Sequence, residues 1–409
     1  MKISNIMRSE LGKGTIVLFV MMNIYFFFNF MFHFAMGRIL GPSDYGVFAV
    51  LMSFIYIYGI PSEAIQNLIS SYVSKLNLNN EEGKIKYLMK KSLKKSFSVS
   101  VIIYLVLVPI SYIISVIIKI NFFYLLLTNL IIFTAVSLPV VRGVLQGRKK
   151  FTQLGIGMIV EAISKLVLSI IFVLIGFNIL GAMYGVLFGI MISFILTYEF
   201  NRKINAVEEK EEKFENIKLE SVPYFISMIV IMLMFSIDII IAKMFFSPED
   251  TGKYAVLSML GKMIFFGTMA IGKVMFPIAS ERHENKKSSK NVFIKSGAVI
   301  FVLCLLGVLI YGLFPELVIK ILFGEKYIEM KPFLIYSAIG FSLLSLTNFI
   351  ILYKLSTKKL KYPYYLFIFL LIEIGVLLFF HNSVKEYIIA FMLSNLIFFL
   401  FSIFTLLKK

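Results

Sequence analysis

The sequence has few charged residues, one cysteine and no tryptophan. Only 16% of its 409 residues are charged and 59% are hydrophobic, whereas soluble domains contain about 25% charged and about 45–50% apolar residues. This composition excludes an ordinary soluble protein, a disordered chain and a nucleic-acid-binding domain. The single cysteine, Cys304, excludes a disulfide scaffold, and together with three histidines it gives no metal-ligand spacing. We therefore expect no metal site and no nucleic-acid partner, and we interpret Cys304 as a small apolar residue.

Long apolar runs dominate the chain instead. A helix of about 20 residues crosses a hydrocarbon core of about 30 Å, and twelve runs of this kind are present. They predict an all-α polytopic membrane protein. The predicted spans are Thr15–Met36, Gly46–Ser70, Phe97–Ile118, Phe122–Val141, Gly155–Gly176, Ile179–Phe200, Val222–Ala242, Tyr254–Ile278, Val292–Phe314, Pro332–Leu352, Pro363–Phe380 and Tyr387–Leu406.

The basic residues are distributed unevenly among the loops. If both termini lie in the cytoplasm, cytoplasmic segments hold 29 Lys and Arg residues, outer segments hold 8, and spans hold 4. Cytoplasmic loops of membrane proteins carry such an excess. The distribution predicts a multi-pass protein of the plasma membrane with both termini inside. Most of the net charge of +18 would then face anionic membrane lipids of the cytoplasmic leaflet.

The chain contains an internal repeat. Gly41–Leu51 and Ser247–Leu257 share six identities in eleven positions, at an offset of 206 residues that is close to half the chain. Each copy follows an odd-numbered span, so the two halves have the same orientation and a pseudo-twofold axis along the membrane normal. The sequence predicts two six-helix lobes, residues 1–200 and 222–409, joined by a cytoplasmic linker, residues 201–221.

The shared residues of the repeat indicate a structural role. They are Pro42, Asp44 and Gly46 in the first copy, and Pro248, Asp250 and Gly252 in the second. Pro and Asp favour a tight turn, Asp can cap the following helix, and Gly permits a close approach of another backbone. We therefore expect Asp44 and Asp250 to act as helix caps.

Several stretches give the chain a family resemblance. They are Gly37–Gly46, Arg142–Gly147, Ser236–Asp238 with Pro248–Ala255, and Leu322–Tyr327. In this order and spacing they resemble the polysaccharide-transporter (Wzx-like) branch of the multidrug/oligosaccharidyl-lipid/polysaccharide (MOP) flippase superfamily. The resemblance implies a MATE-like fold in two lobes and export of a polyprenyl-diphosphate-linked oligosaccharide by alternating access. It leaves polysaccharide-assembly enzymes open as partners.

A few ionisable residues interrupt the predicted spans. Such residues are costly in the membrane and usually face a bundle interior or water. Those that we expect to line a cavity are Lys262, Lys273, Arg142, Asp238, Glu161, Lys165, His33 and Glu373. Under the family resemblance, the basic members would neutralise the diphosphate of the substrate. The acidic members would bind a coupling ion, H⁺ or Na⁺, or hold the cations in place.

Simpler roles remain open for several of these residues. Glu161 and Lys165 are four residues apart on one helix and can pair with each other. Arg142 and Lys273 can extend to the cytoplasmic interface, whereas Lys262 is too deep to do so easily. Asp238 can pair with a neighbouring basic residue, and His33 can have a packing role within its helix.

Two other functions remain open for the whole chain. A multidrug or cation-coupled exporter of the same superfamily would need an acidic cavity, and the charges within the spans here are of both signs. A membrane-embedded polysaccharide polymerase or glycosyltransferase would need a sizeable outer loop with catalytic carboxylates. The largest predicted outer segment is Pro315–Lys331, so we expect a transporter without cofactor and not an enzyme.

Overall fold

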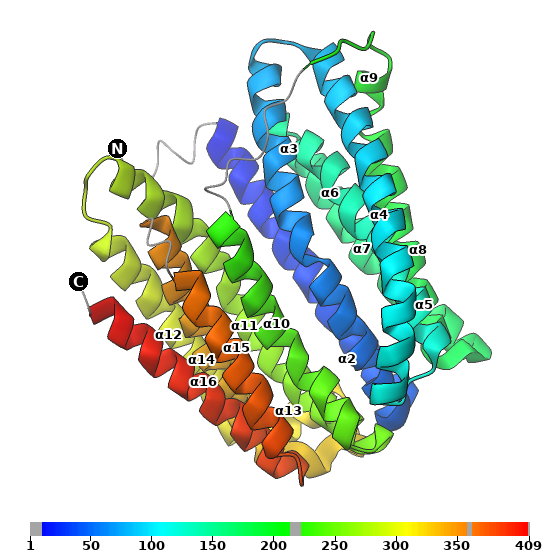
Figure 1. The fold of residues 1–409 in the computed structure, drawn as a ribbon, viewed down its shortest axis with the longest axis vertical. Coiled ribbons are helices and arrows are strands. Elements are labelled where there is room, and N and C mark those ends of the chain that lie inside the picture. The colour runs from blue at the N-terminus through cyan, green and yellow to red at the C-terminus, as the bar shows by residue number, and fades with distance from the viewer. Residues whose placement is uncertain (1–9, 213–221, 358–361, 408–409) are drawn as a thin grey trace. The chain divides into compact units, whose positions relative to one another are not determined.

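The computed structural model describes residues 10–212, 222–357 and 362–407. Within these ranges the chain forms helices and no strands (Figure 1), so the all-α prediction is confirmed. The last part of the predicted linker, residues 213–221, lies outside the described residues. Cys304 is buried in a helix, as expected for a small apolar residue.

Contacts between the helices group the chain into two compact units. Unit 1 comprises residues 1–40 and 54–216, and unit 2 comprises residues 41–53 and 217–409. The segment 41–53 carries the first copy of the repeat motif. It therefore packs with the second half of the chain, although it precedes most of unit 1 in the sequence.

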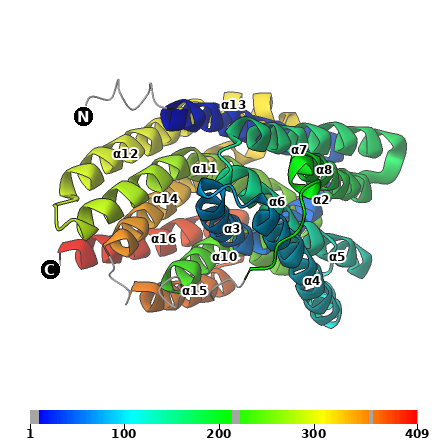
Figure 2. The same cartoon turned by 90° about the horizontal axis from the view of Figure 1, so that it is seen from above.

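Unit 1 is built around α6 and the pair formed by α7 and α8. Helix α6 packs against α3, α4 and α8, and α7 lies beside α8 (Figures 1 and 2). The helices are α2 (Glu10–Tyr58, shared with unit 2), α3 (Ile60–Leu78), α4 (Glu82–Ile118), α5 (Phe122–Asn129), α6 (Ile131–Gly147), α7 (Phe151–Phe172), η1 (Val173–Phe177), α8 (Asn178–Glu199) and α9 (Arg202–Asn205).

Unit 2 is built around α11 and α14, whose apolar stretches are mostly buried, with α12 and α16 against α14 and α15 against α10. Helix α12 exposes most of its apolar side chains, as expected for a helix that contacts lipid. The helices are α10 (Val222–Phe245), α11 (Pro248–Glu284), α12 (Lys290–Leu313), α13 (Pro315–Leu322), η3 (Glu325–Phe333), α14 (Leu334–Ser356), α15 (Tyr362–Phe379) and α16 (Val384–Leu407).

Several helical segments are longer than one membrane crossing requires. In the described ranges, 9 segments are long and apolar enough to cross a bilayer, and Tyr365–Phe379 is a shorter apolar helix. Two of the 9 have 59 and 49 residues, against the roughly 20 that one crossing needs. A glycine with positive φ lies within each, Gly41 (74°) in one and Gly176 (106°) in the other. Each can therefore hold two of the predicted spans, and the total of twelve stays a prediction.

Candidate functional site

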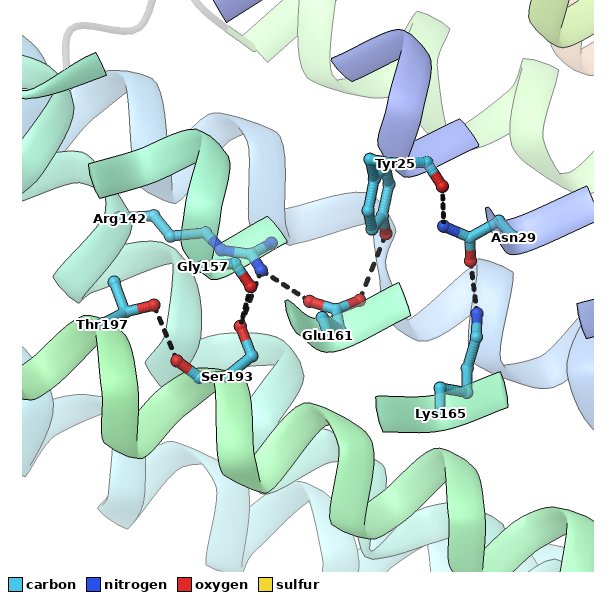
Figure 3. A network of polar contacts seen from close by, with 8 residues as sticks. All are labelled: Tyr25, Asn29, Arg142, Gly157, Glu161, Lys165, Ser193 and Thr197. Atoms are coloured by element: carbon cyan, nitrogen blue, oxygen red, sulfur yellow. Dashed lines mark hydrogen bonds and ion pairs between the residues drawn. The ribbon is translucent and has the colours of Figure 1, made fainter. Parts of the chain in front are cut away.

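Unit 1 holds a cluster of polar side chains between apolar helices (Figure 3). Arg142 of α6 donates from Nη2 to Oε2 of Glu161 of α7 at 2.5 Å and to Oγ of Ser193 of α8 at 3.0 Å. The other carboxylate oxygen of Glu161 accepts from the hydroxyl of Tyr25 of α2 at 3.1 Å. Four helices thus contribute to one network. The side chains of Arg142 and Glu161 are only 12% and 10% exposed, so the pair is largely buried within the unit.

Lys165 gives this cluster a second cation. It lies one turn beyond Glu161 on α7 and is 6% exposed. Its Nζ donates to Oδ1 of Asn29 and lies 4.5 Å from the centre of the Phe32 ring. Asn29 is neutral, and its own amide donates to the carbonyl oxygen of Tyr25 at 2.8 Å. The cluster therefore has two cations and one carboxylate, a combination that favours an added anion in apolar surroundings.

Glycines of α8 bring this helix close to α7 at the cluster. A Cβ atom on Gly189 would lie 2.7 Å from the backbone nitrogen of Lys165, and one on Gly185 would lie 2.4 Å from that of Ser169. Small residues spaced by four let two helices approach closely within a membrane. Gly185 and Gly189, four residues apart on α8, therefore allow the backbone of α7 at Lys165 to lie against α8.

Unit 2 holds a second cluster, centred on the fully buried Asp238 of α10. Its Oδ1 lies 3.2 Å from Nζ of Lys262 of α11. Its Oδ2 accepts from two hydroxyls of α11, Tyr254 at 3.1 Å and Ser258 at 2.6 Å. Tyr387 of α16 donates to the backbone oxygen of Asp238 at 2.6 Å. Helices α11 and α16 thus both form hydrogen bonds with Asp238 of α10.

Glu373 of α15 adds a second acidic group to this cluster. It is 1% exposed, and it interacts electrostatically with both Asp238 and Lys262. Neither of its carboxylate oxygens has a hydrogen-bond partner among the described residues. The carboxyl groups of Asp238 and Glu373 therefore both interact with the ammonium group of Lys262.

Lys262, Lys273 and His33 complete the set of predicted residues. Lys262, expected in a cavity, is 1% exposed and lies 4.9 Å from the ring centre of Phe235. Lys273 is eleven residues further along α11, about 16 Å by helical rise, and is partly buried. His33 of α2 is buried and hydrogen-bonded through Nε2 to the hydroxyl of Tyr56 at 2.8 Å.

The two copies of the repeat motif touch each other within unit 2. A Cβ atom on Gly252 would lie 1.7 Å from the carbonyl oxygen of Pro42, and one on Gly46 would lie 2.6 Å from that of Pro248. Only glycine fits such a contact between backbones. Gly46 and Gly252 thus permit a close approach, and the backbone that approaches is that of the other copy.

The cap of the second copy is a pair of residues. Ser247 accepts from the backbone nitrogen of Asp250 at 3.1 Å and donates its hydroxyl to Oδ2 of Asp250 at 2.8 Å. Ser247 is therefore the capping residue and Asp250 its partner, so the expectation that Asp250 itself is the cap is wrong. Gly41 takes the place of Ser247 in the first copy and has no side chain, so this pair has no counterpart around Asp44.

The sequence pattern did not single out the neutral members of the two clusters. They are Tyr25, Asn29 and Ser193 in unit 1, and Tyr254, Ser258 and Tyr387 in unit 2. A usable signal exists for four of them. Tyr25 and Asn29 are four residues apart, and Tyr254 and Ser258 precede Lys262 at intervals of four, so each set forms a polar stripe on an apolar helix.

The fold and its two buried clusters define a class, that of polytopic membrane proteins with the fold of the MOP superfamily. An inward-facing multidrug resistance MATE family transporter of that superfamily superimposes with a TM-score of 0.70 at 14% identity, over 95% of this chain and 98% of that chain. The lipid II flippase MurJ in an inward closed conformation gives a TM-score of 0.72 at 13% identity, over 96% and 88%. A MOP superfamily transporter from Pyrococcus furiosus gives 0.61 at 15% identity, over 100% and 99%.

A family model narrows this class. The family described as polysaccharide biosynthesis protein matches residues 35–332, which is more than half of the chain. The chain belongs to this family of polysaccharide biosynthesis proteins. A search of curated proteins finds no match.

Proposed function

We propose that this protein is a flippase that moves polyprenyl-diphosphate-linked oligosaccharides from the cytoplasmic to the outer leaflet of the plasma membrane. The observation that carries the proposal is the surplus of positive charge in unit 1, where Arg142 and Lys165 face one carboxylate, Glu161. A diphosphate is an anion that must be neutralised before it enters a hydrocarbon core. Membership of a polysaccharide biosynthesis family and a fold shared with a lipid II flippase support this substrate class.

The two cations have different parts in this proposal. Lys165 is bonded to a neutral amide, so its ammonium group can exchange Asn29 for a phosphate oxygen without breaking an ion pair. Arg142 keeps Glu161 through Nη2, while its buried Nε has no hydrogen-bond partner among the described residues. That N–H group is a donor for a second phosphate oxygen.

We assign energy coupling to unit 2 and to protons. The ammonium group of Lys262 already lies against Asp238, so a metal ion at this place would meet a fixed positive charge. The described residues contain no group of three or more His, Cys, Asp or Glu that could hold a metal ion. A proton on Glu373 gives a neutral carboxyl group, which suits a buried position beside the carboxylate of Asp238. Both termini lie in the cytoplasm in this proposal, following the distribution of Lys and Arg.

The substrate is tested in liposomes that contain the purified protein and a fluorescent lipid-linked oligosaccharide. The rate at which the sugar appears in the opposite leaflet is measured with an impermeant quencher. Lys165→Gln removes a charge-assisted hydrogen bond to phosphate, worth about 1.5–3 kcal/mol, and should slow the appearance about 10- to 100-fold. Lys165→Arg should retain most of the rate. Lys94→Gln is the matched control, because Lys94 is exposed on α4.

Two results would contradict this function. One is a Lys165→Gln rate equal to that of the wild type at equal protein content. The other is transport of a cationic dye without transport of the lipid, which would favour a multidrug exporter.

Coupling is tested in the same liposomes by imposing a proton or a Na⁺ gradient. The proton gradient should accelerate the wild type and leave Glu373→Gln unchanged, and an effect of Na⁺ alone would overturn proton coupling.

A further inference from the structure

Unit 2 contains a set of buried side-chain oxygens without hydrogen-bond partners among the described residues. They include both carboxylate oxygens of Glu373, Oδ1 of Asn395 and Oγ of Ser402. The residues are 1%, 0% and 0% exposed. Folded proteins leave few such atoms unpaired, and buried water molecules satisfy many of them.

Glu373 and Asn395 lie at the same level of two neighbouring helices. Helices α15 and α16 are antiparallel, because Phe369 stacks on Phe398 at 4.6 Å while Tyr365, earlier on α15, packs on Phe401 at 5.7 Å. Glu373 follows Phe369 by four residues and Asn395 precedes Phe398 by three. Both therefore lie about one helical turn beyond the same ring pair, in the same direction.

The polar positions continue along α16. Ser402 follows Asn395 by seven residues, which places it about 10 Å further along and within about 20° of the same helix face. Three residues later, the hydroxyl of Thr405 accepts from Nζ of Lys354 of α14. The set thus leads from Glu373 toward the C-terminal end of α16.

We propose that bound water molecules connect Glu373, Asn395 and Ser402, and that protons pass between Glu373 and the C-terminal end of α16 along this path. The inference rests on the proposed function in one respect, because it takes Glu373 to carry the coupling proton. Four ionisable groups face Glu373: Asp238 of α10, Lys262 and Tyr254 of α11, and Tyr387 of α16. All four are engaged with one another around Asp238. The unpaired oxygens of α16 lie outside that network and lead away from it.

The path is tested by the rate at which the carboxyl proton of Glu373 exchanges with solvent. The full chain in lipid nanodiscs is transferred from H₂O to D₂O, and the infrared band of the protonated carboxyl group is followed in time. The band is assigned to Glu373 by its loss in Glu373→Gln. Asn395→Leu and Ser402→Ala should each slow its shift at least tenfold. Ser394→Ala is the matched control, because Ser394 is adjacent, buried and already bonded to the carbonyl oxygen of Phe391 at 2.8 Å.

The outcomes separate this inference from the proposed function. Unchanged exchange in both Asn395→Leu and Ser402→Ala overturns the path, while proton-driven movement of the lipid in the wild type would still support coupling. The absence of a Glu373 band at every pH tested overturns the path, because the carboxyl group then holds no proton. Slow exchange in the two variants and normal exchange in Ser394→Ala supports the path. Ser402→Ala removes a single hydroxyl, so it remains informative if Asn395→Leu folds poorly.

Discussion

Unit 1 and unit 2 each bury an ion pair among apolar helices, but the surplus charge has opposite sign. In unit 1, Arg142 and Lys165 outnumber Glu161, whereas in unit 2, Asp238 and Glu373 outnumber Lys262. Glu373 follows Glu161 by 212 residues, close to the repeat offset of 206. The comparison teaches that two halves related by a repeat retain places for buried charge while the chemistry of those places diverges. One half suits an anion and the other suits a proton.

The largest effect is expected when the cluster around Asp238 in unit 2 loses the ammonium group of Lys262. Lys262→Met leaves two buried carboxyl groups without an ammonium group, and removing one partner of a buried pair costs about 3–5 kcal/mol. The measurement is the unfolding free energy in detergent. Adding Asp238→Asn to Lys262→Met should recover part of the loss, because the uncompensated charge is then absent. If Lys262→Met alone were as stable as the wild type, the ion pair of Asp238 and Lys262 would contribute nothing to the unfolding free energy.

A smaller effect is expected from the equivalent change in unit 1. Arg142→Met should cost about 1.5–3 kcal/mol, the value of a hydrogen bond to a charged group. The effect is limited because Lys165 remains four residues from Glu161 on the same helix and can neutralise it. The same unfolding measurement compares the two variants directly. A loss as large as that of Lys262→Met would remove the difference between the units.

The comparison is sharpened by a change that touches only unit 1. Gly189→Ala places a methyl group against the backbone of Lys165 and should cost about 1–3 kcal/mol through overpacking. It should also slow movement of the lipid, because the ammonium group is displaced. Gly375→Ala is the control, since a Cβ atom there meets no atom within 4 Å. Equal stability of both variants would mean that α7 and α8 adjust without strain.

The smallest effects should be equal in the two units. Tyr25→Phe and Tyr254→Phe each remove one hydroxyl that donates to a buried carboxylate at 3.1 Å. Each should lower stability by about 1–2 kcal/mol. Unequal losses would show that one of the two carboxylates is not ionised in the folded protein.

The fold was largely predictable from sequence because apolar runs of membrane length dominate the chain. The predicted ends were less accurate where a helix continues beyond the apolar run. Helix α4 begins at Glu82, well before the predicted span Phe97–Ile118. Its first turns hold lysines that pair with the linker, as Lys84 does with Glu212 at 2.6 Å. Such pairs stabilise a polar helix end, and hydropathy alone does not register them.

The charged members of the clusters were predictable, and their partners were not. Arg142, Glu161 and Lys165 stand out because ionisable residues are rare in apolar runs. The partner of Glu161 is Arg142 of another helix and not Lys165 four residues away. That choice depends on how α6 packs against α7. Tyr25 and Tyr254 were missed because they are 2 of 21 tyrosines in the chain.

The contact between the two repeat motifs has a consequence for the order of synthesis. Residues 41–53 belong to unit 2, where Tyr45 packs on Phe323 at 5.7 Å and Gly46 lies against the backbone of Pro248. At about 5–20 residues per second, the ribosome needs roughly 10–40 s to reach the second motif after it has made the first. During that interval, the first motif is already synthesised while its partner does not yet exist. Completion of unit 2 must therefore follow insertion of almost the whole chain.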